Sequence, residues 1–291
     1  MAPAAPARNM RPIIAGIVIV VVVLVAIVGY AVAGFAYSSS RIDSAKTTYN
    51  TVVSHQNALT DEFNSFDSKV STVNVTTATA AELQQNRTAY QQLVTQSQAA
   101  QPTITKDDSD LSAAQASLSE NSWLTILDRS NIDQASNKIG HERKALGDAK
   151  TITGDLVQLG TFYMAFYDSL IDLDTLDTKA QASDFVGAAA AVVTLKADIA
   201  KAIQLAGAPG LPPEMKQFLT VFQSLATDFG KVLSAASAGD SAGADAAVKA
   251  VDADVTKLEG FDFTKMSTAI KAFYQPLIDD FNAEVAKANS A

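Results

Sequence analysis

The stretch that decides the fold is residues 42–73, IDSAKTTYNTVVSHQNALTDEFNSFDSKVSTV. Its apolar residues recur at alternating steps of three and four, which is the spacing of an a/d seam in a coiled-coil helix. The seam consists of Ile42, Ala45, Tyr49, Val52, Gln56, Leu59, Phe63, Phe66, Val70 and Val73. Gln56 is its one polar member, and a single polar seam residue can select register and oligomeric state. The pattern therefore predicts one long helix that packs against another copy of the chain or against other helices of its own chain.

An apolar run precedes this helix. Residues 13–37, IIAGIVIVVVVLVAIVGYAVAGFAY, contain no charge. A helix of this length spans ~37 Å, enough to cross the ~30 Å hydrocarbon core of a bilayer. Tyr30, Phe35 and Tyr37 gather at its end, where aromatic rings favour the membrane interface. Because the seam continues in phase back to Phe35, we expect a transmembrane helix that runs directly into a helical stalk.

Cleavage and orientation are the open points about this segment. AVA at residues 31–33 is an acceptable cleavage site for a signal peptide, but the apolar run exceeds the roughly 7 to 15 residues usual for one. The tail of residues 1–12 carries Arg8 and Arg11 and no acid. The positive-inside rule therefore favours an uncleaved, single-pass anchor in the cell membrane with a cytoplasmic N-terminus and an extracytoplasmic remainder.

The charge of the chain limits its partners. Residues 38–291 hold all 31 acidic residues and 20 of the 22 basic ones. Such an acidic region argues against a nucleic-acid partner and against a face docked on anionic lipid. The chain has no cysteine, so structural disulfides and lipidation at cysteine are excluded.

Two further breaks divide the region up to residue 182. After a break at residues 74–82, Thr77 or Thr79 is expected to cap a second helix, which Pro102 ends. A shorter third helix then carries Leu111, Ala114 and Leu118, and a fourth, from about residue 124 to 178, carries a long heptad-like stripe. If the second and third helices run back along the stalk, Trp123 lies at the membrane interface.

Three glycines recur beside the stripe of the fourth helix. Gly140, Gly147 and Gly154 are seven residues apart, although glycine costs ~1 kcal/mol in a helix interior. The spacing suggests close approach of a neighbouring helix, and chance in a chain with 14 glycines is the alternative.

The C-terminal region contains an internal repeat. DFVGAAAAVVTLKADIAK from Asp184 aligns with DSAGADAAVKAVDADVTK from Asp240, with matching Asp, Gly and Lys positions. The second halves align as well, at Asp228 with Asp280 and at the phenylalanine that follows each. Each unit is expected to be an αα-hairpin with an Asp N-cap, so residues 183–291 are predicted to form a four-helix bundle.

Residues that could carry chemistry are few. His55 and His141 lie in separate helices without metal-ligand spacing, and a solvated surface explains them best. Asp168, Asp172, Asp174 and Asp177 could bind a hard cation or act as acid and base, but no calcium loop accompanies them. An aromatic set at helical spacing could line a cleft, although it is typical of a core. The set consists of Phe162, Tyr163, Phe166 and Tyr167.

Two sequons, NVT at Asn74 and NRT at Asn86, are possible glycosylation sites near the predicted stalk tip. We identify no catalytic residue, no metal site and no cofactor site in the sequence.

The sequence thus predicts an all-α protein with four parts. These are a tail (1–12), a transmembrane helix (13–37), a long-helix stalk bundle (38–182) and a tandem-hairpin domain (183–291). The favoured function is a non-enzymatic, membrane-anchored scaffold or adaptor that contacts an envelope protein or self-associates through its stalk. The alternatives are a ligand-sensing ectodomain that signals through a partner membrane protein, and an envelope hydrolase or metal enzyme assembled across helices.

Overall fold

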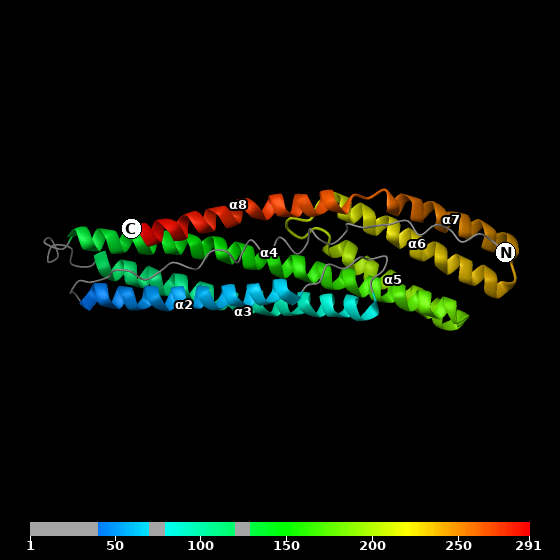
Figure 1. The fold of residues 1–291 in the computed structure, drawn as a ribbon, viewed down its shortest axis with the longest axis horizontal. Helices are drawn as coiled ribbons and strands as arrows, with labels where there is room; N and C mark the ends of the chain where they lie inside the picture. Colours follow the sequence, from blue (N-terminus) through cyan, green and yellow to red (C-terminus); the bar gives the residue numbers. More distant parts are fainter. Residues whose placement is uncertain (1–39, 70–78, 120–128) are drawn as a thin grey trace. The chain divides into compact units, whose positions relative to one another are not determined.

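The computed structural model describes residues 40–69, 79–119 and 129–291, apart from the side chains of 40, 41 and 59–69. These residues form α-helices, with no strand among them, so the all-α prediction is confirmed (Figure 1). The helices are α2 (Ser40–Lys69), α3 (Ala80–Ser119), α4 (Arg129–Gln181), α5 (Phe185–Leu205), α6 (Pro213–Ala238), α7 (Ser241–Glu259) and α8 (Phe263–Ser290). No helix within these described ranges is both long and apolar enough to cross a bilayer. The predicted transmembrane segment, residues 13–37, lies outside them.

The chain forms two compact units. Among the described residues, unit 1 comprises 69, 79–91 and 159–271, and unit 2 comprises 40–68, 92–119, 129–158 and 272–291. The helices α3, α4 and α8 each contribute residues to both units. The units therefore separate at other positions than the predicted domain boundary between residues 182 and 183.

The predicted seam of residues 42–73 packs into the core of unit 2, over the part of the seam whose side chains the structure describes. Ile42, Ala45, Tyr49 and Val52 of α2 are buried in one cluster with apolar residues of α3 and α4. Gln56 is also buried, at 9% exposure. This part of the seam consequently faces helices of the same chain, which decides between the two packing alternatives for residues 42–56.

Helix α3 corrects the prediction that Pro102 ends a helix, because α3 continues through it to Ser119. Proline removes one backbone hydrogen bond and costs ~3 kcal/mol in a helix interior. The reason for continuity is the seam, which keeps its alternating steps across the proline. Its buried members are Leu83, Asn86, Tyr90, Leu93, Ser97, Ile104, Asp107, Leu111 and Leu118. Burial of this uninterrupted stripe offsets the cost of one proline.

The start of α3 confirms one of the two predicted caps. The backbone N–H of Glu82 donates to Thr79 Oγ1 at 3.3 Å, and the N–H of Thr79 donates to Glu82 Oε2 at 2.8 Å. This reciprocal pair is a capping box, which satisfies two backbone donors that the helix itself leaves open.

The helices predicted for the repeat are present as α5 to α8, and the contacts support the first of the two predicted hairpins. Helices α5 and α6 pack together, as do α6 and α7 (Figure 1). Asp184 caps α5 by accepting the N–H of Gly187 at 2.9 Å, and Asp240 caps α7 by accepting the N–H of Gly243 at 2.9 Å. A Cβ on either glycine would collide with the capping carboxylate. The matched Asp and Gly positions of the repeat are therefore one capping motif, used twice.

This motif makes a testable prediction about stability. Asp240→Ala should lower the free energy of unfolding by ~1 kcal/mol because it removes the cap of α7. Gly243→Ala should also destabilise while Asp240 is present, although alanine is the better helix former. In urea unfolding of the full chain, the double variant should lose less than the sum of the two single losses. Strictly additive losses would contradict the shared motif.

Candidate functional site

Most of the predicted membrane and glycosylation residues lie outside the described ranges. These residues are Tyr30, Phe35, Tyr37, Asn74 and Trp123. Their roles stay predictions.

Asn86 is described, and its position corrects the proposal of a glycan there. It has 0% exposure on α3, and its Nδ2 donates to the hydroxyl of Tyr167 at 3.3 Å. A glycan on this nitrogen is incompatible with the packing around it. The seam itself carried this signal, because Asn86 occupies a core position between Leu83 and Tyr90.

The two histidines each pair with an acid instead of lying free at the surface. His55 Nδ1 is 3.0 Å from both carboxylate oxygens of Asp107, and His141 Nδ1 is 2.7 Å from Glu284 Oε2. Hydrogen bonds from Lys287 and His141 lower the pKa of Glu284 to about 2. Sequence reasoning could not find these pairs, because their members lie 52 and 143 residues apart.

A buried acid lies in the core of unit 2. Glu142 of α4 has 1% exposure, and its Oε1 has no hydrogen-bond partner among the described residues. Burial raises the pKa of the Glu142 carboxyl, and hydrogen bonds with Gln56 and Tyr49 only partly offset that effect. Nearby, Lys138 lowers this pKa and Asp107 raises it. A carboxyl in such surroundings favours its neutral form.

Glu142 and Asp107 are the buried acids that the sequence reading missed. Both stand at seam positions, Glu142 between Ile139 and Leu146 and Asp107 between Ile104 and Leu111. The heptad spacing could have identified both acids as buried, because each occupies a core position of its heptad. A charged residue at such a position needs polar neighbours.

Two of the predicted acidic residues contact other helices. Burial, a hydrogen bond with Asp198 of α5 and the charges of Asp198 and Asp168 raise the pKa of Asp172 to about 6. Asp168 itself accepts a hydrogen bond from Arg87 Nε at 2.6 Å. The carboxyl of Asp172 thus holds its proton more tightly than an isolated carboxyl does.

This carboxyl pair predicts a pH dependence. The folded pKa of Asp172, about 6, lies above its ordinary value of 3.8, so the folded state binds more protons between these values. Stability should consequently fall as the pH rises from 4 to 7, by on the order of 1 kcal/mol after solvent screening. Asp172→Asn should flatten this part of the profile in urea unfolding. Asp174→Asn on the same helix is the matched control, and an equal effect there would contradict the assignment.

The aromatic set forms part of the core of unit 1. Phe162 and Tyr163 have 0% exposure, and the ring of Tyr163 stacks on that of Tyr90 with centroids 4.8 Å apart. Phe166 meets Phe218 of α6 edge to face at 6.2 Å. The core interpretation is therefore confirmed, and these rings are not free to line a cleft.

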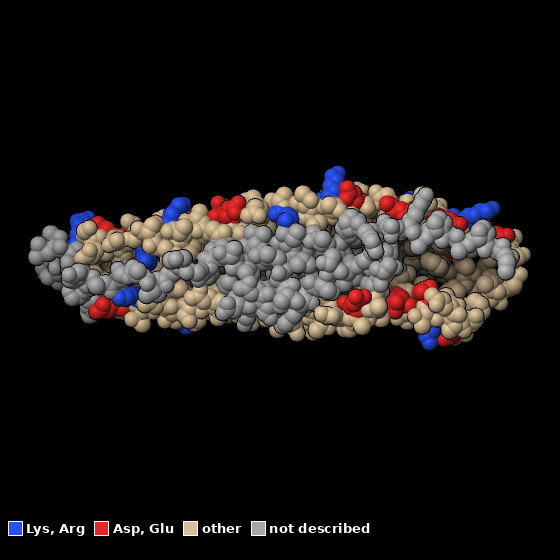
Figure 2. Space-filling view, in the orientation of Figure 1, with Lys and Arg blue, Asp and Glu red and all other residues tan. Residues whose placement is uncertain are grey.

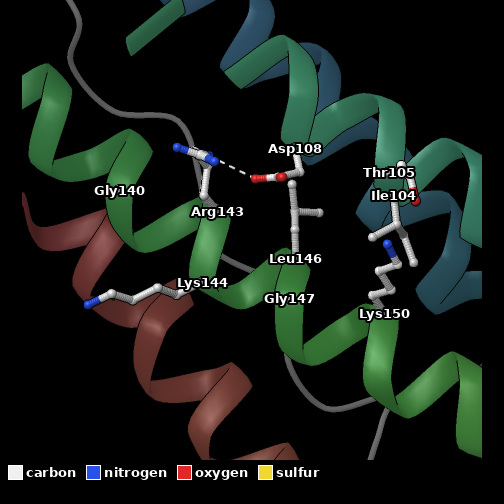
Figure 3. Close-up of a pocket in the computed structure, with 9 residues that line it drawn as sticks. All are labelled: Ile104, Thr105, Asp108, Gly140, Arg143, Lys144, Leu146, Gly147 and Lys150. Carbon is white, nitrogen blue, oxygen red and sulfur yellow. Dashed lines mark hydrogen bonds and ion pairs between the residues drawn. The ribbon is translucent and has the colours of Figure 1, made fainter. Parts of the chain in front are cut away.

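A groove of about 390 Å³ lies between α3 and α4 in unit 2 (Figure 3). We call it the α3/α4 groove. Its lining comprises Ile104, Thr105 and Asp108 of α3, with Gly140, Arg143, Lys144, Leu146, Gly147 and Lys150 of α4. At one end Arg143 Nε donates to Asp108 Oδ1 at 2.8 Å, and Arg143 Nη1 donates to Gln115 Oε1 at 3.2 Å.

Of the three glycines spaced seven residues apart, Gly140 and Gly147 line this groove. A Cβ on Gly147 would meet no atom within 4 Å, and one on Gly140 would meet only the Gln115 side-chain amide at 3.5 Å. The nearest atom to a Cβ on Gly154 is the Gln101 side-chain amide, at 3.4 Å. No backbone atom of a neighbouring described helix lies within 4 Å of these Cβ positions, so the described helices do not support the close-approach interpretation. Two of the three glycines instead leave space in the groove.

The described ranges contain no cluster of three or more histidine, aspartate or glutamate side chains that could hold a metal ion. Comparison with known proteins finds no matching family model, no similar curated protein and no similar solved structure.

Proposed function

We propose that this protein is a membrane-anchored helical scaffold or adaptor of the cell envelope. Residues 13–37 tether it to lipid as a single-pass helix with the N-terminus in the cytoplasm, and the acidic helices beyond them present contact surfaces outside. The support for the tether is the uncharged apolar run, which is long enough to cross a bilayer. No catalytic role is proposed for the described residues.

The observation that carries the contact role is a pair of exposed valines on each of α5 and α7. Val186 and Val193 of α5 are 85% and 69% exposed, and Val248 and Val255 of α7 are 44% and 39% exposed. In each helix the two valines are seven residues apart, so they lie on nearly the same side, two turns from each other. Exposed apolar side chains at helical spacing favour docking of a protein partner.

The surface charge fits a protein partner better than nucleic acid. On the face shown in Figure 2, acidic and basic side chains are scattered among other residues outside the grey atoms. A net charge of −9 also repels a phosphate backbone. A contact surface in this region therefore depends on apolar burial and not on a basic patch.

The anchor is tested by fractionation of cells that express the full chain with a tag at either end. The protein should stay in the membrane after alkaline carbonate extraction, and added protease should remove only the C-terminal tag from intact cells. Deletion of residues 1–37 should release the protein. Extraction of the full chain by salt, or a mature chain that begins near Gly34, would refute the anchor.

The contact role is tested by a photo-crosslinking amino acid placed at Val193 or Val255 of the full chain in the native host. A discrete crosslinked product with one envelope protein is expected at both positions. Lys216, an exposed polar position on α6, is the control and should give none. Equal products at all three positions, or none at Val193 and Val255, would refute the adaptor.

A second function, a ligand-sensing ectodomain, is favoured by the α3/α4 groove. Such an ectodomain would transmit ligand binding to a partner membrane protein.

A further inference from the structure

The α3/α4 groove concentrates positive charge in an acidic protein. Arg143, Lys144 and Lys150 line it, against the single carboxylate of Asp108. The chain as a whole carries a net charge of −9, so most of its surface repels anions. A concave site with surplus cations therefore stands out as the place where a small anion is attracted.

Lys150 is the cation in the groove that is most available to a ligand. Its ammonium forms no ion pair or hydrogen bond with the described residues, whereas Lys144 lies 3.9 Å from Glu284. In Figure 3 the Lys150 side chain points across the groove toward Ile104 and Thr105 of α3. A ligand at this end would meet an ammonium and a hydroxyl side by side.

The opposite end of the groove offers a second donor. Arg143 uses its Nε and Nη1 groups for Asp108 and Gln115, which leaves Nη2 for another acceptor. Arg143 and Lys150 are seven residues apart, or ~10 Å along the helix axis. Between them lie the apolar side chain of Leu146 and the open space above Gly147.

Gly147 supplies an independent reason to regard the groove as a binding site. Glycine costs ~1 kcal/mol in a helix interior, and here no atom of the described residues would obstruct an added Cβ. Packing therefore does not explain the glycine. Its effect is to keep the middle of the groove open.

We propose that the α3/α4 groove binds a small organic dianion, with one acidic group at Lys150 and Thr105 and the other at Arg143. The carbon skeleton lies over Gly147 and against Leu146 and Ile104. Dicarboxylates and phosphorylated carboxylic acids share this chemistry, and inorganic phosphate stands in for the phosphoryl group at one end. The proposal goes beyond the scaffold function and involves residues 104–150 alone, so it can hold whether or not residues 13–37 anchor the chain.

The test uses the full chain purified in neutral detergent. Succinate and inorganic phosphate are titrated separately at constant ionic strength, and binding is followed by calorimetry and by the thermal unfolding midpoint. One of the two should bind saturably, and which one does so distinguishes a dicarboxylate from a phosphate ligand. Acetate, which carries one charge, should bind at least tenfold more weakly.

Two variants separate this site from general surface charge. Lys150→Gln removes the available cation, and Gly147→Leu fills the groove without changing any charge. Each should weaken binding at least tenfold and leave the helical content unchanged. Lys249→Gln, an exposed lysine on α7, is the matched control and should bind as the unaltered chain does. The proposal is overturned if neither probe saturates, if Lys249→Gln matches Lys150→Gln, or if only an acidic peptide binds.

Discussion

Phe162→Ala should destabilise the protein by ~3 to 5 kcal/mol, one of the two largest effects expected of single substitutions in this chain. Phe162 has 0% exposure and lies within the aromatic core of unit 1. Its ring meets that of Tyr163 edge to face at 5.2 Å and stacks with that of Phe166 at 6.2 Å. Removal of the ring leaves a cavity that the surrounding rings can fill only partly, so the loss exceeds the transfer free energy of the side chain alone.

The matched control is Phe185→Ala. Phe185 is 52% exposed at the start of α5, so the same change there should alter the free energy of unfolding by no more than about 0.5 kcal/mol. Urea unfolding of the full chain, followed by circular dichroism, measures both variants. Similar losses at the two positions would show that Phe162 is not a core residue.

Glu142→Gln should stabilise the protein at pH 8 by ~1 to 3 kcal/mol and have little effect at pH 4. Burial raises the pKa of this carboxyl above its ordinary value, so the folded state favours the protonated form. The contribution of Glu142 to stability is therefore present at low pH and is lost as the pH rises toward its folded pKa. Glutamine has nearly the same shape and stays neutral, so it removes the cost of a buried charge.

A truncated variant distinguishes charge from packing at this position. Glu142→Ala should destabilise by ~2 to 4 kcal/mol at pH 8, because it leaves a cavity and takes a partner from Tyr49 and Gln56. Glu259→Gln at the exposed end of α7 is the control and should not change the pH profile. A Glu142→Gln protein that is less stable than the unaltered chain at pH 8 would mean that the charge is favourably paired, with Lys138 the nearest candidate.

Periodicity predicted the helices well, because burial along a heptad stripe outweighs local propensity. The stripe of α3 identified Leu111 and Leu118 as core residues, and both are buried. The same stripe contradicted the stop assigned to Pro102. A proline in a helix interior costs ~3 kcal/mol, but this cost alone does not decide where the helix ends, because continuing the helix buries more apolar side chains.

The site was less predictable, because its residues come from different helices. The spacing of Gly140 and Gly147 marked one side of the α3/α4 groove, but no pattern in α3 indicated that Asp108 would lie opposite Arg143. The partners of His55 and of His141 were equally hidden, since pairing across 52 or 143 residues depends on which helices become neighbours. Heptad spacing specifies a buried face and leaves the choice of neighbouring helix open.

Helices α5 and α7 begin with the same capping pair of aspartate and glycine, and this pair limits how each copy of the repeat can change. Since a side chain on Gly187 or Gly243 would collide with the capping carboxylate, neither member of the pair can change alone without a penalty. Each capping pair therefore changes most readily as a unit, and the repeat stays recognisable at these positions where the residues around them differ.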